Sequence, residues 1–219
     1  MSRKILIAAA VALAGVSAGA VAQVDGFIRD PAQVQSGTYV LDPAHGKITW
    51  SVDHMGFSTY IGQFTDVNAT LNLDVRNPSA SKLKAQVKTD SVGSLNSALD
   101  GHLKTADFLD TAKHPTAGFQ ATKLRMIDAD SAEIAGNLTL RGVTKPIVIV
   151  ADFNQAGVNP VDQKYTVGFD GHARIKRSDF GIAYGLPVLG DDVTLHFEAE
   201  FKLQGEPAVQ KTSTGKKAK

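Results

Sequence analysis

Histidines and acidic residues are the side chains in this sequence that could carry acid–base chemistry or bind a metal ion. There are six histidines and 22 aspartates and glutamates. The densest cluster contains Asp100, His102, Asp107 and Asp110, types that general acid–base catalysis uses. A solvent-exposed face of a short helical segment explains them more simply. No two histidines have the spacing of a ligand pair on one helix or strand, so the sequence predicts no metal site.

Familiar catalytic signatures are missing from the sequence. It contains no Gly-x-Ser-x-Gly motif, no Walker loop, no dinucleotide fingerprint and no cysteine. The formal charge of +1 gives no general attraction to nucleic acid. The sequence therefore predicts no catalytic residues, no cofactor and no nucleic-acid partner.

Two pairs of polar residues remain as candidates for recognising a ligand. His54 ends an apolar row and Tyr60 follows in the next segment, so both could hydrogen-bond the polar end of a ligand. A structural histidine bonded to the backbone is the alternative. Arg177 and Asp179 are predicted to form a structural pair beside a loop, with a role in holding a ligand head group as the alternative.

Apolar and polar side chains alternate along most of the chain, as they do in strands that are buried on one face. Trp50, Val52 and His54, for example, share one face of their segment. The segments predicted to be strands are 38–41, 47–54, 57–64, 67–75, 83–89, 117–121, 132–140, 147–153, 165–175 and 193–203. About eight substantial strands at hairpin spacing predict an all-β antiparallel barrel, with a β-sandwich as the alternative.

Three local features refine this picture. Gly62 lies inside a predicted strand, where glycine often permits the bend or bulge that a small barrel needs. Residues 141–146 are predicted to be a connector. The following segment, 147–153, is apolar on both faces, so we expect its outer side to be covered as well.

The longest interruption of the strand pattern is residues 94–119. Apolar residues recur there at helical spacing, at Leu95, Ala98, Leu99 and Leu103. Ser94 is placed to cap this helix, Thr105 to cap a second turn, and Pro115 to end helical structure. A helix with an apolar stripe must lie on an apolar surface. We therefore predict a lid over the open end of a barrel that encloses an apolar cavity.

The first 22 residues have the pattern of a secretory signal peptide. A basic start at residues 2–4 precedes an apolar run at residues 5–14, and residues 20–22 fit a cleavage site. We expect cleavage after Ala22 and a periplasmic protein; an uncleaved membrane anchor is the alternative. The rest divides into an N-terminal leader (23–37), the barrel domain (38–204) and a basic, disordered tail (205–219).

Several segments carry a resemblance to a known family. They are VDHMGFSTYIGQF at 52–64, GHLKTADFLDTAKHPTAGF at 101–119, GNLTLRGVTKP at 136–146 and RSDFGI at 177–182. With them the chain resembles, over residues 38–203, the YceI-like family of exported polyisoprenoid-binding proteins. It departs from the usual pattern at Leu109, where an aromatic residue is common, and at His114, where tyrosine is frequent. These changes affect the lining of the mouth.

The resemblance implies a lipocalin-like, eight-stranded antiparallel barrel whose tunnel holds a long isoprenoid chain, such as a polyprenyl lipid or a quinone tail. The inward rows agree, because apolar walls suit branched hydrocarbon. We predict a non-enzymatic carrier, with a membrane redox protein as a candidate partner. An enzyme that modifies an isoprenoid or fatty-acyl lipid in the same cavity, and a module with a filled core, are the alternatives. Whether the barrel forms a homodimer is left open.

The predicted ligand-binding residues lie on inward strand faces, in the lid or in the loops beside it. They are Trp50, Val52, His54, Phe57, Tyr60, Leu71, Leu73, Leu103, Phe108, Leu109, Phe119, Ile134, Leu138, Phe169, Phe180 and Phe197. For Trp50 and Phe119, a place in an ordinary packed core is the alternative.

Overall fold

Long strands dominate the computed structural model, which describes residues 26–205. The predicted signal peptide, the first residues of the leader and nearly all of the tail lie outside this range. The strands are β1 (Gly37–Leu41), β2 (Lys47–His54), β3 (Ser58–Phe64), β4 (Val67–Leu73), β5 (Lys82–Lys88), β6 (Val92–Gly93), β7 (Thr116–Met126), β8 (Ser131–Leu140), β9 (Val143–Val158), β10 (Tyr165–Lys176) and β11 (Leu189–Leu203).

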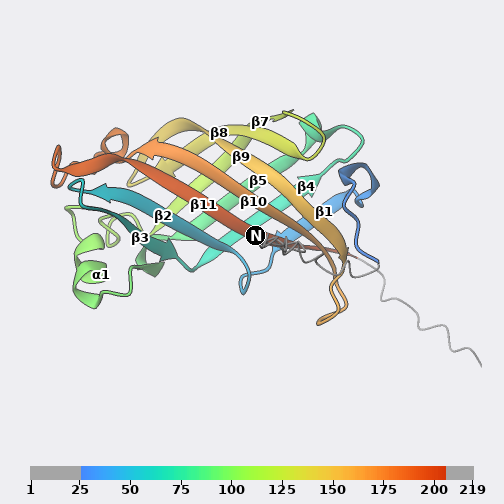
Figure 1. The fold of residues 1–219 in the computed structure, drawn as a ribbon, viewed down its shortest axis with the longest axis horizontal. Coiled ribbons are helices and arrows are strands. Elements are labelled where there is room, and N and C mark those ends of the chain that lie inside the picture. Colours follow the sequence, from blue (N-terminus) through green and yellow to red (C-terminus); the bar gives the residue numbers. More distant parts are fainter. Residues whose placement is uncertain (1–25, 206–219) are drawn as a thin grey trace, which may run out of the picture.

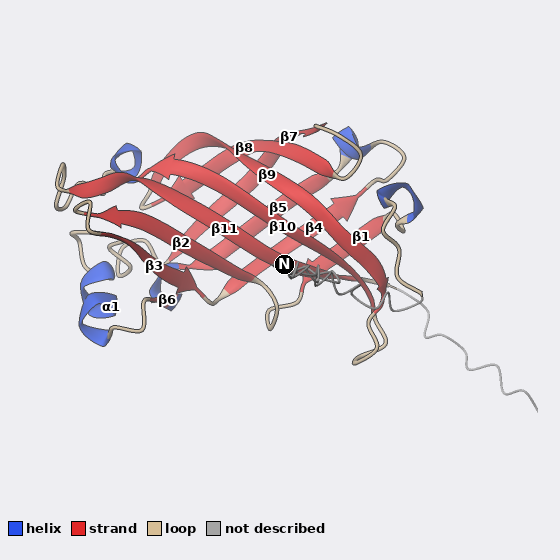
Figure 2. Ribbon diagram, viewed as in Figure 1, coloured by secondary structure: helices blue, strands red, loops and turns tan. Residues whose placement is uncertain are grey.

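Short helices lie beyond the ends of the strands (Figure 2). The one α-helix in the described part of the chain is α1 (Ser97–Leu103). The short 3-10 helices are η1 (Pro31–Gln33), η2 (Pro78–Ala80), η3 (Thr89–Ser91) and η4 (Arg177–Phe180).

Eight strands close into an antiparallel barrel, which confirms the predicted fold. Their order is β1, β4, β5, β7, β8, β9, β10, β11, and the ring closes because β11 also pairs with β1. The first part of β11 pairs instead with β2, which is followed by β3 and β6. Figure 1 shows the resulting crossed strands, with α1 at one end. The first part of β11 therefore anchors the strands that lead to the lid.

Strand alternation explains which side chains face the interior. Between β4 and β5 the apolar residues stand opposite one another, for example Leu71 beside Leu83 and Val67 beside Val87. The intervening Thr70 stands beside Lys84 on the outer face. Because the side chains of a strand alternate between faces, one register places a whole apolar row inside.

Two tight turns fix the hairpins at the lid end. Met55 and Gly56 have φ values of 59° and 72°, and Arg141 and Gly142 have 49° and 75°. Two successive residues in the left-handed region are typical of two-residue hairpin loops. β8 and β9 are thus joined by two residues, and the connector predicted to reach residue 146 was too long. Pro146 is tolerated inside β9 because the recorded pairing with β10 ends at Val150.

The outer face of β9 is open, against the prediction that it would be covered. Val148 is 48% exposed. No second layer packs on this face at Val148. The apolar residues on both faces of the segment are therefore explained by their high β-propensity.

Gly62 makes room for a side chain, and no bulge interrupts the strand pair at this glycine. β2 and β3 keep one register through the Trp50–Gly62 pair, so the predicted bulge was wrong. A Cβ atom at Gly62 would lie 2.2 Å from Cζ2 of Trp50. Gly136 does the same for Phe119, whose Cζ atom would lie 2.3 Å from an added Cβ. At both glycines the absence of a side chain lets an aromatic ring pack directly against the backbone of the barrel wall.

The lid begins two residues later than predicted. Asn96 caps α1 by accepting hydrogen bonds from the amides of Ala98 and Leu99. Ser94 instead donates from its amide and its hydroxyl to the Asp100 carboxylate, at 2.7 and 2.6 Å. Leu95 has a φ of 62° and is fully exposed, so it is not part of the apolar stripe.

Part of the predicted leader belongs to the barrel. Val34 is buried in the same apolar cluster as Tyr39, and Ile28 forms a β-bridge with Ala156. Figure 1 shows this blue segment at the end of the barrel opposite α1. The leader therefore helps to close the end that the lid does not cover.

Candidate ligand-binding cavity

A cavity of about 770 Å³ lies inside the barrel. Inward side chains from every long strand line it, together with residues of the lid. The predicted residues that line it are Trp50, Val52, His54, Tyr60, Leu71, Leu73, Leu103, Phe108, Leu109, Phe119, Ile134, Leu138, Phe169 and Phe197. Their place on the wall follows from strand alternation and from the apolar stripe of the lid. That they bind a ligand stays a prediction.

Phe57 and Phe180 do not line this cavity, which corrects their predicted position. Phe57 directly follows the Met55–Gly56 turn and is 88% exposed, because it precedes the first residue of β3. Phe180 is buried in η4 and borders a second, outer hollow. Phe57 was predicted to start the strand 57–64, but β3 begins only at Ser58. Phe180 lies outside every predicted strand, so the periodic pattern could not fix its direction.

The interior divides into separate apolar clusters around the cavity. One surrounds Tyr39 and Phe201 where β1 meets β11, one surrounds Trp50 beneath the lid, and one surrounds Phe119. A barrel of eight strands is wide enough to enclose a small ligand when its side chains do not fill it. The inward rows thus border a hollow space as well as one another.

Aromatic rings connect the lid to the opposite loop. The ring centroid of His102 lies 5.0 Å from that of Phe108 and 4.9 Å from that of Tyr184, and Phe108 and Tyr184 are 5.2 Å apart. His102 Nε2 lies 2.8 Å from Asp107 Oδ2. Sequence reasoning missed Tyr184, because it lies in a loop without a periodic pattern. The four residues predicted as an acid–base alternative thus include one His–Asp pair in the lid.

A second row of rings extends from the wall of β2 to β3. Trp50 is stacked with Tyr60 at a centroid distance of 6.4 Å, and His54 lies 6.0 Å from Tyr60. The indole Nε1 of Trp50 is buried and has no hydrogen-bond partner among residues 26–205. Within the same residues the side chains of His54 and Tyr60 form no hydrogen bond. Each of these three residues also lines the cavity.

The domain assignment follows from residues 39–201, which match the YceI-like domain family. This chain belongs to the YceI-like family. It is 39% identical over 170 residues to a UPF0312 protein of Azotobacter vinelandii, covering 77% of this chain and 88% of that protein. It is 38% identical over 170 residues to a UPF0312 protein of Pseudomonas aeruginosa, with the same coverage.

Solved structures of similar proteins share the YceI-like barrel. A Campylobacter jejuni YCEI protein is 32% identical, with a TM-score of 0.60 and coverage of 70% of this chain and 90% of that chain. A polyisoprenoid-binding domain from Saccharophagus degradans is 13% identical, with a TM-score of 0.57 and coverage of 77% and 99%. The second likeness shows the fold alone.

Arg177 of this YceI-like protein is buried and is held by backbone carbonyl groups. Its guanidinium donates to the carbonyl oxygens of Ile182, Tyr184, Leu189 and Gly190. Burial lowers the pKa of this guanidinium, which stays charged at neutral pH. The predicted pair with Asp179 does not form within the described part of the chain. Arg177 therefore organises the loop that carries Tyr184.

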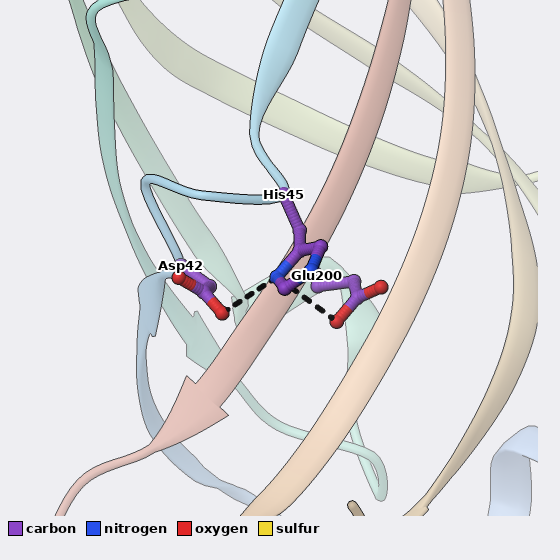
Figure 3. Close-up of side chains that lie close together, drawn as sticks. All are labelled: Asp42, His45 and Glu200. Carbon is purple, nitrogen blue, oxygen red and sulfur yellow. Dashed lines mark hydrogen bonds and ion pairs between the residues drawn. The ribbon is translucent and has the colours of Figure 1, made fainter. Parts of the chain in front are cut away.

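A polar cluster stands apart from the cavity, where β11 pairs with β1 and runs past the turn after β1. We call it the closing seam; it consists of Asp42, His45, Asp162, Glu200 and Lys202. Figure 3 shows three of its members, with His45 Nδ1 placed 2.8 Å from Asp42 Oδ2 and 3.8 Å from Glu200 Oε2. Their ligand-type atoms lie within 4.8 Å of one another, as a metal site would require.

Lys202 supplies the positive charge that this cluster needs. Its Nζ lies 2.6 Å from Asp42 Oδ2 and 2.5 Å from Asp162 Oδ2. The hydrogen bond from Lys202 holds the pKa of the Asp42 carboxyl well below its usual range, with His45 and the Ala44 amide adding to the effect against desolvation. A fixed ammonium beside the shared carboxylate disfavours a divalent ion there. The absence of a native metal site stays a prediction.

No helix between residues 26 and 205 is long and apolar enough to cross a membrane.

Proposed function

We propose that this protein is a periplasmic, non-enzymatic carrier that holds an isoprenoid lipid, either a polyprenyl lipid or the tail of a quinone, inside its barrel. The observation that carries the proposal is the apolar cavity of about 770 Å³ inside the barrel, which lies within the usual range for small-molecule sites of roughly 300–1,000 Å³. Its wall consists mostly of aliphatic and aromatic side chains.

Burial of hydrocarbon provides the affinity. Each methylene removed from water contributes about 0.8 kcal/mol, so a five-carbon isoprene unit contributes roughly 3 kcal/mol before the costs of ordering the chain. A charged metabolite gains little in such a cavity because it loses its hydration. Family membership supports the same ligand class, and a structural neighbour is described as polyisoprenoid-binding.

The periplasmic location rests on the signal-peptide pattern of residues 1–22. In that compartment a carrier can move a lipid between membranes or deliver a quinone to a membrane redox protein. N-terminal sequencing of the exported protein tests the location: we expect a chain that begins at Gln23. A chain that begins at Met1 in the membrane fraction would contradict it.

Mass spectrometry of the purified protein tests the carrier function. The full-length chain is expressed with its signal peptide, purified without detergent and extracted with organic solvent. We expect an isoprenoid lipid at a ratio close to one per chain. An empty extract, together with no uptake of added isoprenoid lipid, would favour the filled module. A chemically altered product from the added lipid would favour the enzyme.

A further inference from the structure

Exposed apolar side chains gather at the lidded end of the barrel. They come from the β2–β3 hairpin, from the stretch between β6 and α1, and from the loop between η4 and β11. Figure 1 shows the arrowhead of β2, the start of β11 and α1 at this same end. We call these side chains the apolar rim; they are Met55, Phe57, Leu95, Tyr184 and Val188.

Strand pairing and a ring contact bring the three segments of the rim together. Leu189 pairs with His54, so the loop before β11 lies beside the β2–β3 turn. β6 pairs with β3 of the same hairpin, and the segment that contains Leu95 follows β6 directly. The ring centroids of His102 in α1 and Tyr184 in the loop are 4.9 Å apart. The rim therefore surrounds the lid.

The rim is continuous with the wall of the cavity. Tyr184 is half exposed and also lines the cavity. Leu189, at the end of the same loop, lines the cavity too, as do Leu99 and Leu103 of α1. Apolar surface therefore extends from the interior of the barrel to the exposed rim.

The segments that carry the rim contain no charged side chain. Residues 54–65, 91–99 and 182–190 include no aspartate, glutamate, lysine or arginine, although these types make up 21% of the chain. The rest of the lid, residues 100–113, carries charges of both signs. Exposed loops of a protein surrounded only by water have no reason to exclude charge.

The loops at the opposite end of the barrel are charged. In the β9–β10 loop, Val161 is 90% exposed but is followed by Asp162 and Lys164. The β7–β8 hairpin carries Asp128 and Asp130. A charged side chain enters the apolar part of a bilayer only at a high cost in free energy. Of the two ends, the lidded one is therefore suited to contact with lipid.

We propose that the lidded end binds the surface of a phospholipid bilayer, and that Phe57, Leu95 and Val188 enter its interfacial layer while cargo moves between the membrane and the cavity. The proposal rests on the carrier function and deepens it, because it names the surface with which the lipid is exchanged. The tyrosine at position 184 suits the same layer, where amphipathic rings are enriched. Because the rim segments are uncharged, the attraction is apolar and a bilayer of neutral lipids suffices.

The shape of the rim favours a membrane over a partner protein. A protein interface buries one continuous, well-packed patch, whereas these side chains protrude singly from three segments. A bilayer deforms around such separate side chains. Phe57, Leu95 and Val188 do not line the cavity, so membrane contact sets the rate of exchange and leaves the amount of lipid held at equilibrium unchanged.

A fluorescent label at one position tests the contact directly. The chain has no cysteine, so a single introduced cysteine can carry one environment-sensitive fluorophore. Val188→Cys places it on the rim, and Val161→Cys places it on an exposed valine at the opposite end. The labelled full-length proteins are mixed with phosphatidylcholine vesicles that contain ubiquinone. We expect a blue shift of the emission at position 188 and none at position 161.

Uptake of quinone tests the role of the contact. Val188→Asp and Val161→Asp make the same substitution at the two ends. Delipidated protein is mixed with the vesicles and separated from them at intervals, and its quinone is measured by mass spectrometry. We expect Val188→Asp to slow uptake by about threefold to tenfold, through a lost apolar contact and an added charge. Val161→Asp should keep the wild-type rate, and both variants should reach the same final amount.

The outcomes separate this proposal from the carrier function. Equal emission at the two labelled positions, or equal uptake rates in the two aspartate variants, overturns the membrane contact and leaves the carrier intact. A blue shift at position 188 without any uptake overturns the carrier function and leaves the contact. A response that requires anionic lipid and disappears in salt overturns the apolar attraction. A response only to vesicles that contain membrane proteins assigns the rim to a protein partner and overturns the proposal.

Discussion

The lidded end of the barrel and the closing seam differ in whether their polar groups have partners. At the seam, Lys202 pairs with two carboxylates, and His45 lies within 4 Å of two. At the lidded end, the Trp50 N–H is buried and unpaired within the described range. The seam looks more like an active site, but its members are occupied with one another. The comparison shows that a cluster of charged residues can be fully explained by the closure of the barrel.

The largest expected effect comes from a charge placed on the apolar wall of the cavity. Phe119→Asp places a carboxylate on the cavity wall, where the wild-type ring is 7% exposed and seated over Gly136. An unpaired buried charge opposes both folding and hydrocarbon binding. We expect the lipid that copurifies with the protein to fall at least about tenfold, as measured by mass spectrometry of the folded fraction.

Phe57→Asp is the matched control, because Phe57 is 88% exposed outside the cavity. We expect it to retain the wild-type amount of lipid. Equal losses in the two variants would contradict the assignment of inward and outward faces.

The second prediction concerns the seat of the Trp50 ring. In Gly62→Ala the added methyl group would lie 2.2 Å from Trp50 Cζ2 and 2.6 Å from the backbone oxygen of Gly93. We expect a loss of about 1–3 kcal/mol in the free energy of unfolding, since overpacking shifts the ring or the strand. Urea titration and the emission spectrum of Trp50 measure the two effects.

Gly118→Ala provides the comparison, because the nearest atom to its added methyl group lies 3.7 Å away. We expect this variant to keep the wild-type emission spectrum. The same emission shift in both variants would argue against a specific seat for Trp50 at Gly62.

The third prediction tests the closing seam. Lys202→Met leaves Asp42 without its ammonium partner, although the side chain of Asp42 is only 10% exposed. Solvent reaches the edge of this pair, so we expect a loss of about 1–2 kcal/mol in the free energy of unfolding, below the full cost of an isolated buried charge. The folded protein should keep the wild-type amount of copurified lipid. A loss of lipid would mean that the seam and the cavity are coupled.

The fourth and smallest effect is the pH dependence of the seam. The pKa of Asp42 is lower in the folded protein than in the unfolded chain, chiefly through its bond to Lys202. Its contribution to stability is therefore present above about pH 4, the usual carboxyl range, and is lost as the pH falls from there toward the folded pKa. We expect the stability difference between wild type and Lys202→Met to shrink from pH 5 to pH 2. A constant difference would contradict the assignment.

Strand periodicity made most of the wall predictable, because a period of two fixes the face of every residue in a regular strand. It could place Leu71 and Phe197 inside, and both line the cavity. Phe57 was misplaced because the predicted strand began one residue before β3 does, and periodicity gave no direction for Phe180, in a short helix. The role of Gly62 was misinterpreted because it depends on Trp50, which stands opposite in β2 and whose ring leaves no space for a side chain at position 62.

Contacts between segments that are distant in the chain could not be predicted from the sequence. Val34 looked like part of a leader because its apolar neighbours in the fold, such as Tyr39, are provided by the strands. Arg177 was expected to pair with a carboxylate, but its partners are main-chain carbonyl groups of the next loop, which no residue type reveals. The closing seam joins residues 42 and 202, so only the closure of the barrel brings them together.

The division of the interior into clusters around Tyr39, Trp50 and Phe119 has a thermodynamic consequence. Leu83 packs against the first and the third of these clusters, whereas the cluster around Trp50 shares no residue with either. A hydrocarbon chain that contacts all three joins them into one cooperative unit. Calorimetry of the loaded protein should then show a sharper transition at a higher temperature, because a ligand that binds only the folded state stabilises it.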